Sequence, residues 1–266
     1  MCGTSCILVA VIVTCKTDVL MSAEQVRCSR QTKKGPEREL GYNAQRQFPV
    51  LTYNNMACPS VEEFKELLRR ETPEKIIQDH IFGGDVYLAR EHPRVLNTLR
   101  RHLCPRLRFE EQNVIIVGSA KIGFSLDPDS FPRGFTKSRD IDVLVVSETL
   151  FDTYWQTMLS WHYPRRLKRL PESDWQWVIS RQRDLYWGWF HPDEIRYEGL
   201  TFPEVLKPLR DLKTKWFSSF KSLSLYEEFS GRNVNGRLYR TWKHALLYQA
   251  SGLRQIQGRL AQGEEK

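Results

Sequence analysis

The sequence predicts an α/β (α+β) fold, in which a small mixed sheet is surrounded by N-terminal and C-terminal helices. Two short segments rich in β-branched residues, Asn113–Val117 and Ile141–Val146, are bounded by turn residues, as is typical of buried strands. Apolar residues recur at helical spacing before the first segment and after the second. The 266-residue chain is 41% hydrophobic, which is enough for a substantial core. We therefore expect the two segments to be adjacent strands of one sheet.

Residues 1–55 differ from the rest of the chain. Cys6–Val13 is apolar but far too short to span a bilayer, and no Lys or Arg precedes it as in a signal peptide. The stretch 22–53 is mostly polar and has no period. We expect an extension outside the fold, either disordered or untranslated, with translation starting at Met56 or Met21. A weak export or anchoring segment is the alternative.

Three helices are predicted before the first strand. Ser60-Val61-Glu62-Glu63 has the pattern of a capping box, in which the first and last residues satisfy each other's backbone amides. Thr72 can cap a second helix, which ends at Gly83, and a third runs from about Pro93 to Leu103. Three histidines lie in this region at spacings that fit no metal site, so we expect surface or core roles for them: His80, His92 and His102.

The chain after the second strand is predicted to be helical. Ser147 is a candidate cap for a helix over 148–161, and no later segment has a clear strand pattern. Ser230–Asn235 is predicted as a loop and a basic last helix begins near Gly236. Its cations, among them Arg237, either contact phosphate or RNA or form a solvated face. The other predicted helices are Trp175–Tyr186 and Leu209–Leu223.

Polar residues lie at the end of the first predicted strand and at the start of the second. Side chains alternate along a strand, so Asp140 and Asp142 lie on one face, about 7 Å apart. Two carboxylates held in this way suit hard cations with oxygen ligands, and burying them without metal would be costly because like charges repel. Gly118-Ser119, at the end of the neighbouring strand, offers a close backbone approach, a hydroxyl and backbone amides, which suit phosphate.

This pattern resembles the nucleotidyltransferase fold of the DNA polymerase β-like superfamily. The signature of that family is a strand ending in Gly-Ser, a helix, and then Asp-x-Asp on the next strand, as in Gly118-Ser119 and Asp140-Ile141-Asp142. Residues 60–260 also look like an uncharacterised bacterial subgroup of the superfamily. Twenty residues separate Ser119 from Asp140, about twice the usual gap, and the excess is predicted as a hairpin or loop inserted at Asp127–Lys137.

The resemblance implies transfer of a nucleoside monophosphate from a nucleoside triphosphate such as ATP to an acceptor hydroxyl, with release of pyrophosphate. Asp140 and Asp142 would hold Mg²⁺, and Gly118 and Ser119 would grip the β- and γ-phosphates. Lys121 either adds charge or faces solvent. The sequence does not identify the acceptor, which could be a small molecule, RNA, a protein side chain or another nucleotide. By the same resemblance, residues 56–200 form the nucleotidyltransferase-like domain, and 201–266 form a helical region that packs on the same core.

The family also supplies a third carboxylate from a later strand, for which the sequence offers only candidates: Asp174, Asp184 and Asp193. The alternative is therefore a catalytically inactive module that binds RNA or a partner protein. A third carboxylate beside Asp140 and Asp142 would favour the enzyme, and its absence together with a continuous basic groove would favour the binding module.

Charge and cysteine content restrict the partners and the compartment. Lys and Arg outnumber Asp and Glu by 40 to 32, which fits an anionic partner such as a nucleotide or RNA as well as a solvated surface. After residue 60 the chain has one cysteine, Cys104, so this region is not a fold held together by disulfide bonds. We expect a reducing, cytoplasmic location and no membrane partner.

Overall fold

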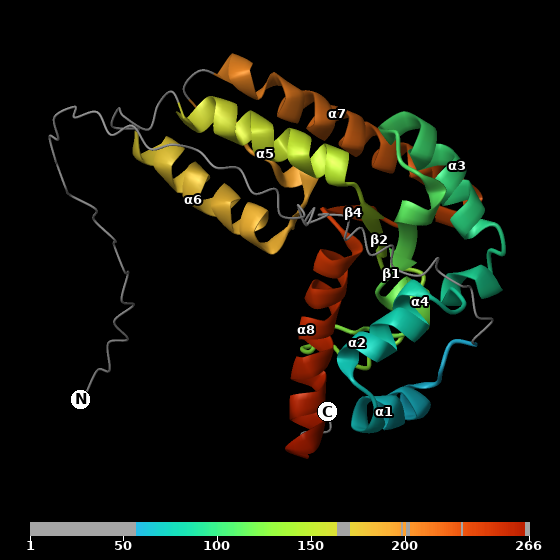
Figure 1. Ribbon diagram of the computed structural model, residues 1–266. Coiled ribbons are helices and arrows are strands. Elements are labelled where there is room, and N and C mark those ends of the chain that lie inside the picture. Colours follow the sequence, from blue (N-terminus) through green and yellow to red (C-terminus); the bar gives the residue numbers. More distant parts are fainter. Residues whose placement is uncertain (1–56, 164–170, 198, 201–202, 230, 264–266) are drawn as a thin grey trace, which may run out of the picture. The chain divides into compact units, whose positions relative to one another are not determined.

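The computed structural model describes residues 57–163, 171–197, 199–200, 203–229 and 231–263 (Figure 1). The prediction for residues 1–55 therefore lies outside the described part of the chain.

A four-stranded mixed sheet lies at the centre of the described residues, with strand order β1-β2-β4-β3. β1 (Val114–Val117) pairs antiparallel with β2 (Ile141–Val146), which confirms that the two predicted strands are neighbours. β2 pairs parallel with β4 (Val234–Tyr239), and the short β3 (Trp189–Phe190) pairs antiparallel with β4. The mixed α/β fold expected from the sequence is thus confirmed.

The prediction of a loop over Ser230–Asn235 and of a helix from near Gly236 is wrong from Val234 onward, because Val234–Tyr239 form β4. At Gly236 a Cβ atom would lie 2.3 Å from the ring of Phe220 and 2.6 Å from that of Trp216, so helix α7 packs directly on the backbone of the strand. The last helix, α8 (Trp242–Ala261), begins only after Thr241, whose side chain accepts a hydrogen bond from the backbone of His244. Residues 201–266 therefore contribute a strand that lies inside the sheet.

Helices cover both faces of the sheet (Figure 1). Along β2 the side chains alternate, so that Asp142, Leu144 and Val146 share one face while Ile141, Val143 and Val145 share the other. The Leu144 face packs against α1 (Val61–Arg70), α2 (Pro73–Ile76), the π-helical segment Ile77–Phe82 and α8. The Val143 face packs against α3 (Val95–Leu107), α5 (Glu148–His162), α6 (Glu172–Trp187) and α7 (Lys207–Lys221).

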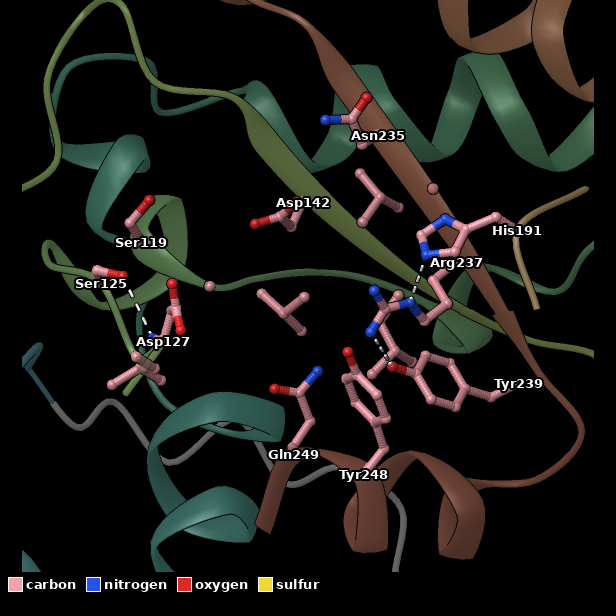
Figure 2. A pocket seen from close by; sticks show the side chains of 16 residues that line it. Ser119, Ser125, Asp127, Asp142, His191, Asn235, Arg237, Tyr239, Tyr248 and Gln249 are labelled. Carbon is pink, nitrogen blue, oxygen red and sulfur yellow. Dashed lines mark hydrogen bonds between the residues drawn. The ribbon is translucent and has the colours of Figure 1, made fainter. Parts of the chain in front are cut away.

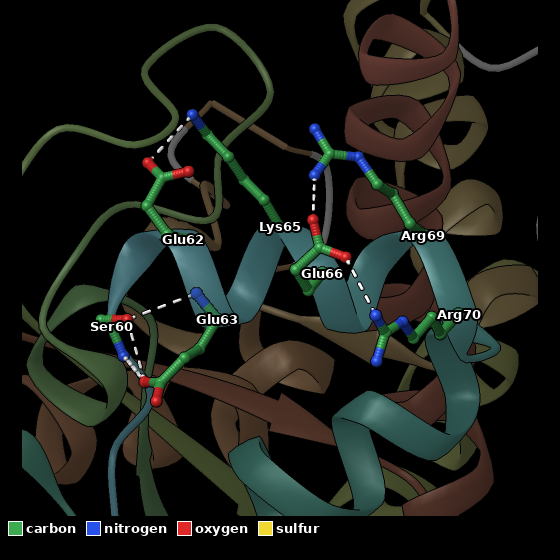
Figure 3. A network of polar contacts seen from close by, with 7 residues as sticks. All are labelled: Ser60, Glu62, Glu63, Lys65, Glu66, Arg69 and Arg70. Carbon is green, nitrogen blue, oxygen red and sulfur yellow. Dashed lines mark hydrogen bonds and ion pairs between the residues drawn. The ribbon is translucent and has the colours of Figure 1, made fainter.

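The predicted helix caps are present. Ser60 and Glu63 form a reciprocal pair at the start of α1: the Ser60 hydroxyl accepts from the Glu63 amide at 3.3 Å, and the Ser60 amide donates to the Glu63 carboxylate at 2.7 Å (Figure 3). Thr72 caps α2 through the amide of Lys75, and Ser147 caps α5. These side chains satisfy backbone donors that have no partner within their own helices.

The predicted insertion is a hairpin that follows the single helical turn α4 (Ser119–Ile122). Phe124 bridges Gly134 across the hairpin, and the Ser125 amide donates to the Arg133 carbonyl at 2.8 Å. Arg259 of α8 holds the hairpin tip, donating to the Pro128 carbonyl and pairing with the Asp129 carboxylate at 2.7 Å. The insertion is therefore tied to the helix that covers the Asp142 face.

One of the three histidines before the first strand can be compared directly with its expected surface or core role. His102 is buried and hydrogen-bonded to the Tyr226 hydroxyl and the Ser219 carbonyl, each at 3.0 Å, so it has the core role expected of it.

Across the described ranges we find no helix with the length and apolar character needed to cross a membrane.

Replacing Ser60 by Ala should lower the free energy of unfolding by about 1 kcal/mol, because it removes the hydroxyl that caps α1. Urea unfolding followed by circular dichroism measures the loss. Glu62→Ala is the control, since it leaves the cap in place and removes an exposed pair with Lys65 and one first-turn carboxylate, which should cost about 0.5 kcal/mol. A loss for Ser60→Ala no larger than that of the control would contradict the cap.

Candidate functional site

A pocket of about 250 Å³ opens on the sheet face that carries Asp142 (Figure 2). Its wall combines the turn after β1, the first half of β2, the middle of β4 and one face of α8. The hairpin and the segment after β3 complete it. Three of the sequence-predicted site residues line this pocket: Gly118, Ser119 and Asp142.

Gly118 and Asp142 are in close contact at the edge of the sheet. Gly118 has φ 66° and ψ −149°, a conformation that residues with a side chain rarely adopt. A Cβ atom at this position would lie 2.7 Å from Oδ2 of Asp142. The strand register places Asp142 opposite Val117, immediately before this turn. Glycine is thus required both for the turn and for the space that the carboxylate occupies.

The environment of Asp142 disfavours its negative charge. Part of its surface is exposed, but the side chain lies within the pocket wall and is largely surrounded by protein atoms. This burial raises the pKa of Asp142 from 3.8 to about 6; Arg237 opposes the change, and the charge of Asp140 adds to it. A cation beside Asp142 would favour the ionised carboxylate.

Asp140 lies just before β2, exposed, and does not line the pocket. Its carboxylate accepts hydrogen bonds from the side-chain amides of Asn233 at 3.3 Å and Asn235 at 3.1 Å. Asn235, which donates to Asp140, is also the register partner of Asp142, so the two carboxylates lie at the same end of β2. The asparagines fix Asp140 at the start of the strand without neutralising it.

The later strand beside β2 places an asparagine, Asn235, and not a carboxylate, next to Asp142. β4 is the later strand beside β2, and its register pairs Asn235 directly with Asp142. None of the three candidates lines the pocket: Asp174 is buried in α6, Asp184 pairs with Arg181 at 2.6 Å, and Asp193 lies in the turn after β3. Within the described ranges, no group of three or more His, Cys, Asp or Glu side chains could hold a metal.

The inserted hairpin brings a different carboxylate to the pocket. Asp127 lines the pocket on the same side as Ser119 and Ser125 and is exposed (Figure 2). Its oxygens accept from the Asp129 amide and the Ser130 hydroxyl, each at 3.2 Å. The sequence identified the insertion but gave no role to its first residue.

Lys121 is not a pocket residue. Its side chain is buried on another side of α4, where Nζ donates to the Gly84 carbonyl at 2.8 Å. Burial lowers the pKa of Lys121 to about 8. The structure therefore does not bring Lys121 together with Gly118, Ser119 and Asp142, and neither of the two roles expected for it describes its position.

Arg237 supplies the positive charge of the pocket instead. Its guanidinium carbon lies 4.3 Å from the ring centroid of Tyr248 and 4.7 Å from that of Trp189. Its Nε donates to Nε2 of His191 at 2.9 Å (Figure 2). A ring nitrogen that accepts carries no proton, so His191 is neutral, and burial followed by the charge of Arg237 lowers its pKa.

Of the pocket residues on β4 and α8, the sequence indicates only Arg237, as a candidate phosphate contact on a helix, because it predicts a loop and a helix in place of the strand. The signal that could have revealed the strand is the alternation Asn235, Arg237, Tyr239 around a central glycine.

Comparison of the chain with protein-family models, with curated proteins and with solved structures finds no match.

Asp142→Asn should raise the melting temperature of the metal-free protein near neutral pH. The pKa of Asp142 is higher in the folded state than its usual value, so ionisation destabilises the fold. The destabilisation is complete above about pH 6 and fades as the pH falls toward the usual pKa of 3.8. Calorimetry in chelator at about pH 7.5 and about pH 4 should therefore show the variant more stable only at the higher pH.

The control is Asp211→Asn on α7, an exposed carboxylate whose pKa is lowered by a hydrogen bond from Lys207. This variant should show no gain at either pH. A melting temperature of Asp142→Asn equal to or below that of the wild type near pH 7.5 would contradict the unfavourable charge.

Proposed function

We propose that this protein is a Mg²⁺-dependent nucleotidyltransferase, which transfers a nucleoside monophosphate from a nucleoside triphosphate to an acceptor hydroxyl and releases pyrophosphate. The observation that carries the proposal is the contact of Asp142 with the Gly118-Ser119 turn, in a pocket at the sheet edge. Asp140, two residues earlier, brings a second carboxylate to the same strand end.

The donor set fits magnesium. Mg²⁺ prefers oxygen ligands and is usually bound by one or two protein carboxylates together with substrate phosphates. Asp140 and Asp142 are carboxylates of this kind, and the raised pKa of Asp142 marks a place where a cation would be favourable. When bound, Mg²⁺ supplies charge neutralisation for the triphosphate and for the transition state of an in-line displacement.

The other pocket residues would bind and orient the substrate. The Gly118 backbone has no side chain to keep a phosphate away, and the Ser119 hydroxyl can donate a hydrogen bond to it. A cavity of about 250 Å³ is smaller than the roughly 300–1,000 Å³ of pockets that enclose whole ligands. It therefore suits part of a nucleotide, with the remainder and the acceptor at the open side.

Asn235 favours a second candidate, a nucleotide-binding module without transferase activity. An asparagine offers a neutral amide oxygen where a carboxylate would add charge, and its nitrogen donates to Asp140. Fewer negative ligands would weaken the binding of a second cation. With Asn235 at this position, both nucleotide binding and transfer would have to use Asp140 and Asp142 without a carboxylate from β4, so a transfer assay separates the two candidates.

Incubation with each α-labelled nucleoside triphosphate and Mg²⁺, with and without cellular RNA, tests the transfer. We expect label to move to an acceptor, and Asp140→Asn and Asp142→Asn each to abolish this while remaining folded. Mg²⁺ with nucleotide should also raise the wild-type melting temperature, and either variant should lose that shift. Asp211→Asn is again the control, since Asp211 pairs with Lys207 on α7, away from the pocket.

Nucleotide-dependent stabilisation without transfer would support the second candidate, and Asn235→Asp should then increase the affinity for the metal. Absence of both stabilisation and transfer would refute the two candidates together.

A further inference from the structure

The guanidinium of Arg237 is held in one orientation by four side chains. It lies against the rings of both Trp189 and Tyr248, which also contact each other, and it donates to Nε2 of His191 at 2.9 Å and to the Tyr239 hydroxyl at 3.5 Å. These neighbours come from β3, β4, α8 and the segment after β3. An arginine fixed in this way loses little further conformational entropy when it binds a ligand.

The charge of Arg237 has no carboxylate partner. In the part of the chain that the structure describes, Arg237 makes no ion pair, although Asp142 is close enough to feel its charge. Other arginines of the described chain are paired, such as Arg259 with Asp129 and Arg254 with Glu74. A half-buried guanidinium normally pairs with an anion, because removing the charge from water is costly.

Arg237 also lines the pocket rather than filling the core beneath it (Figure 2). The strand register pairs it with Leu144, two residues along β2 from Asp142. Arg237 and Asp142 are thus separated by one pleat, about 7 Å along the sheet, and both border the same cavity. The pocket places a carboxylate suited to a cation beside a cation suited to an anion.

We propose that Arg237 binds a phosphoryl group of a polyphosphate chain directly and is the anion-recognition residue of this pocket. The identification of the anion as part of a nucleoside triphosphate rests on the proposed function. A polyphosphate can interact with both charged groups of the pocket, because one phosphate can bind Arg237 while another binds a cation that Asp142 also coordinates. A planar guanidinium with two aromatic neighbours offers paired N–H donors that match phosphate oxygens.

Titration calorimetry with tripolyphosphate in chelator tests the proposal without metal or turnover. The wild type should bind, and Arg237→Gln should bind about 10- to 100-fold more weakly, as expected for the loss of charge-assisted hydrogen bonds. Arg237→Lys keeps the charge but not the paired donors, and it should fall between the two. Arg254→Gln, the same change at an exposed position on α8 outside the pocket, should bind like the wild type.

A purely structural role would give a different result. Arg237→Gln and Arg237→Lys would then lower the melting temperature of the ligand-free protein, while the folded fraction kept wild-type affinity for tripolyphosphate. That result, or absence of tripolyphosphate binding by the wild type, would overturn the proposal. If Arg237→Gln does not fold, the comparison of Arg237→Lys with Arg254→Gln decides.

The test also separates this inference from the proposed function. Asp142→Asn should retain or improve metal-free tripolyphosphate binding, because it removes a negative charge from the same pocket. Arg237-dependent binding of tripolyphosphate without any effect of Mg²⁺-nucleotide would support the anion site and refute the transferase. Stabilisation by Mg²⁺-nucleotide that is equal in wild type and Arg237→Gln would refute the anion site and leave the proposed nucleotide binding at Asp140 and Asp142 standing.

Discussion

The close approach of the Asp142 carboxylate to the backbone of Gly118 is the constraint on which the rest of the site depends. The antiparallel pairing of β1 and β2 sets the distance between the two strand ends, and no side chain fits between them. Only glycine adopts this turn without strain and leaves room for the carboxylate. The two layers of helices hold the strands, so the position of Asp142 is fixed by the fold and not by a flexible loop.

The pocket holds a carboxylate, Asp142, and a guanidinium, Arg237, that do not form an ion pair with each other. Buried charges usually lie in ion pairs, which limit the cost of removing them from water. Here Asp142 and Arg237 line one pocket without pairing: Asp142 lies close to the glycine turn, and Arg237 contacts two aromatic rings and a neutral histidine. On the proposed function, a metal-bound nucleotide would bring a cation to Asp142 and a phosphate to Arg237 at the same time.

The sequence predicts much of the fold and part of the site, for physical reasons that differ between elements. Val114–Val117 is buried on both faces, so its apolar run is easily identified as a strand, and the Ser60 and Ser147 caps follow from local chemistry. β4 is different, because its Asn235 and Arg237 face a polar pocket and its Gly236 lies under an aromatic ring. The features that make β4 part of the site are those that remove its strand pattern. Lys121 could not be placed either, since the direction of a side chain on one helical turn depends on distant residues such as Gly84.

The central claim is that Asp140 and Asp142 form a cation site that acts together with the phosphates of a nucleotide. Crystals grown with Mn²⁺ and a non-hydrolysable nucleoside triphosphate would test it most directly, through the anomalous signal of the metal. We predict a manganese peak bound by Asp142 and Asp140, with the triphosphate extending from the Gly118-Ser119 turn toward Arg237. A pocket without manganese, in crystals where the nucleotide is bound elsewhere or not at all, would contradict the account.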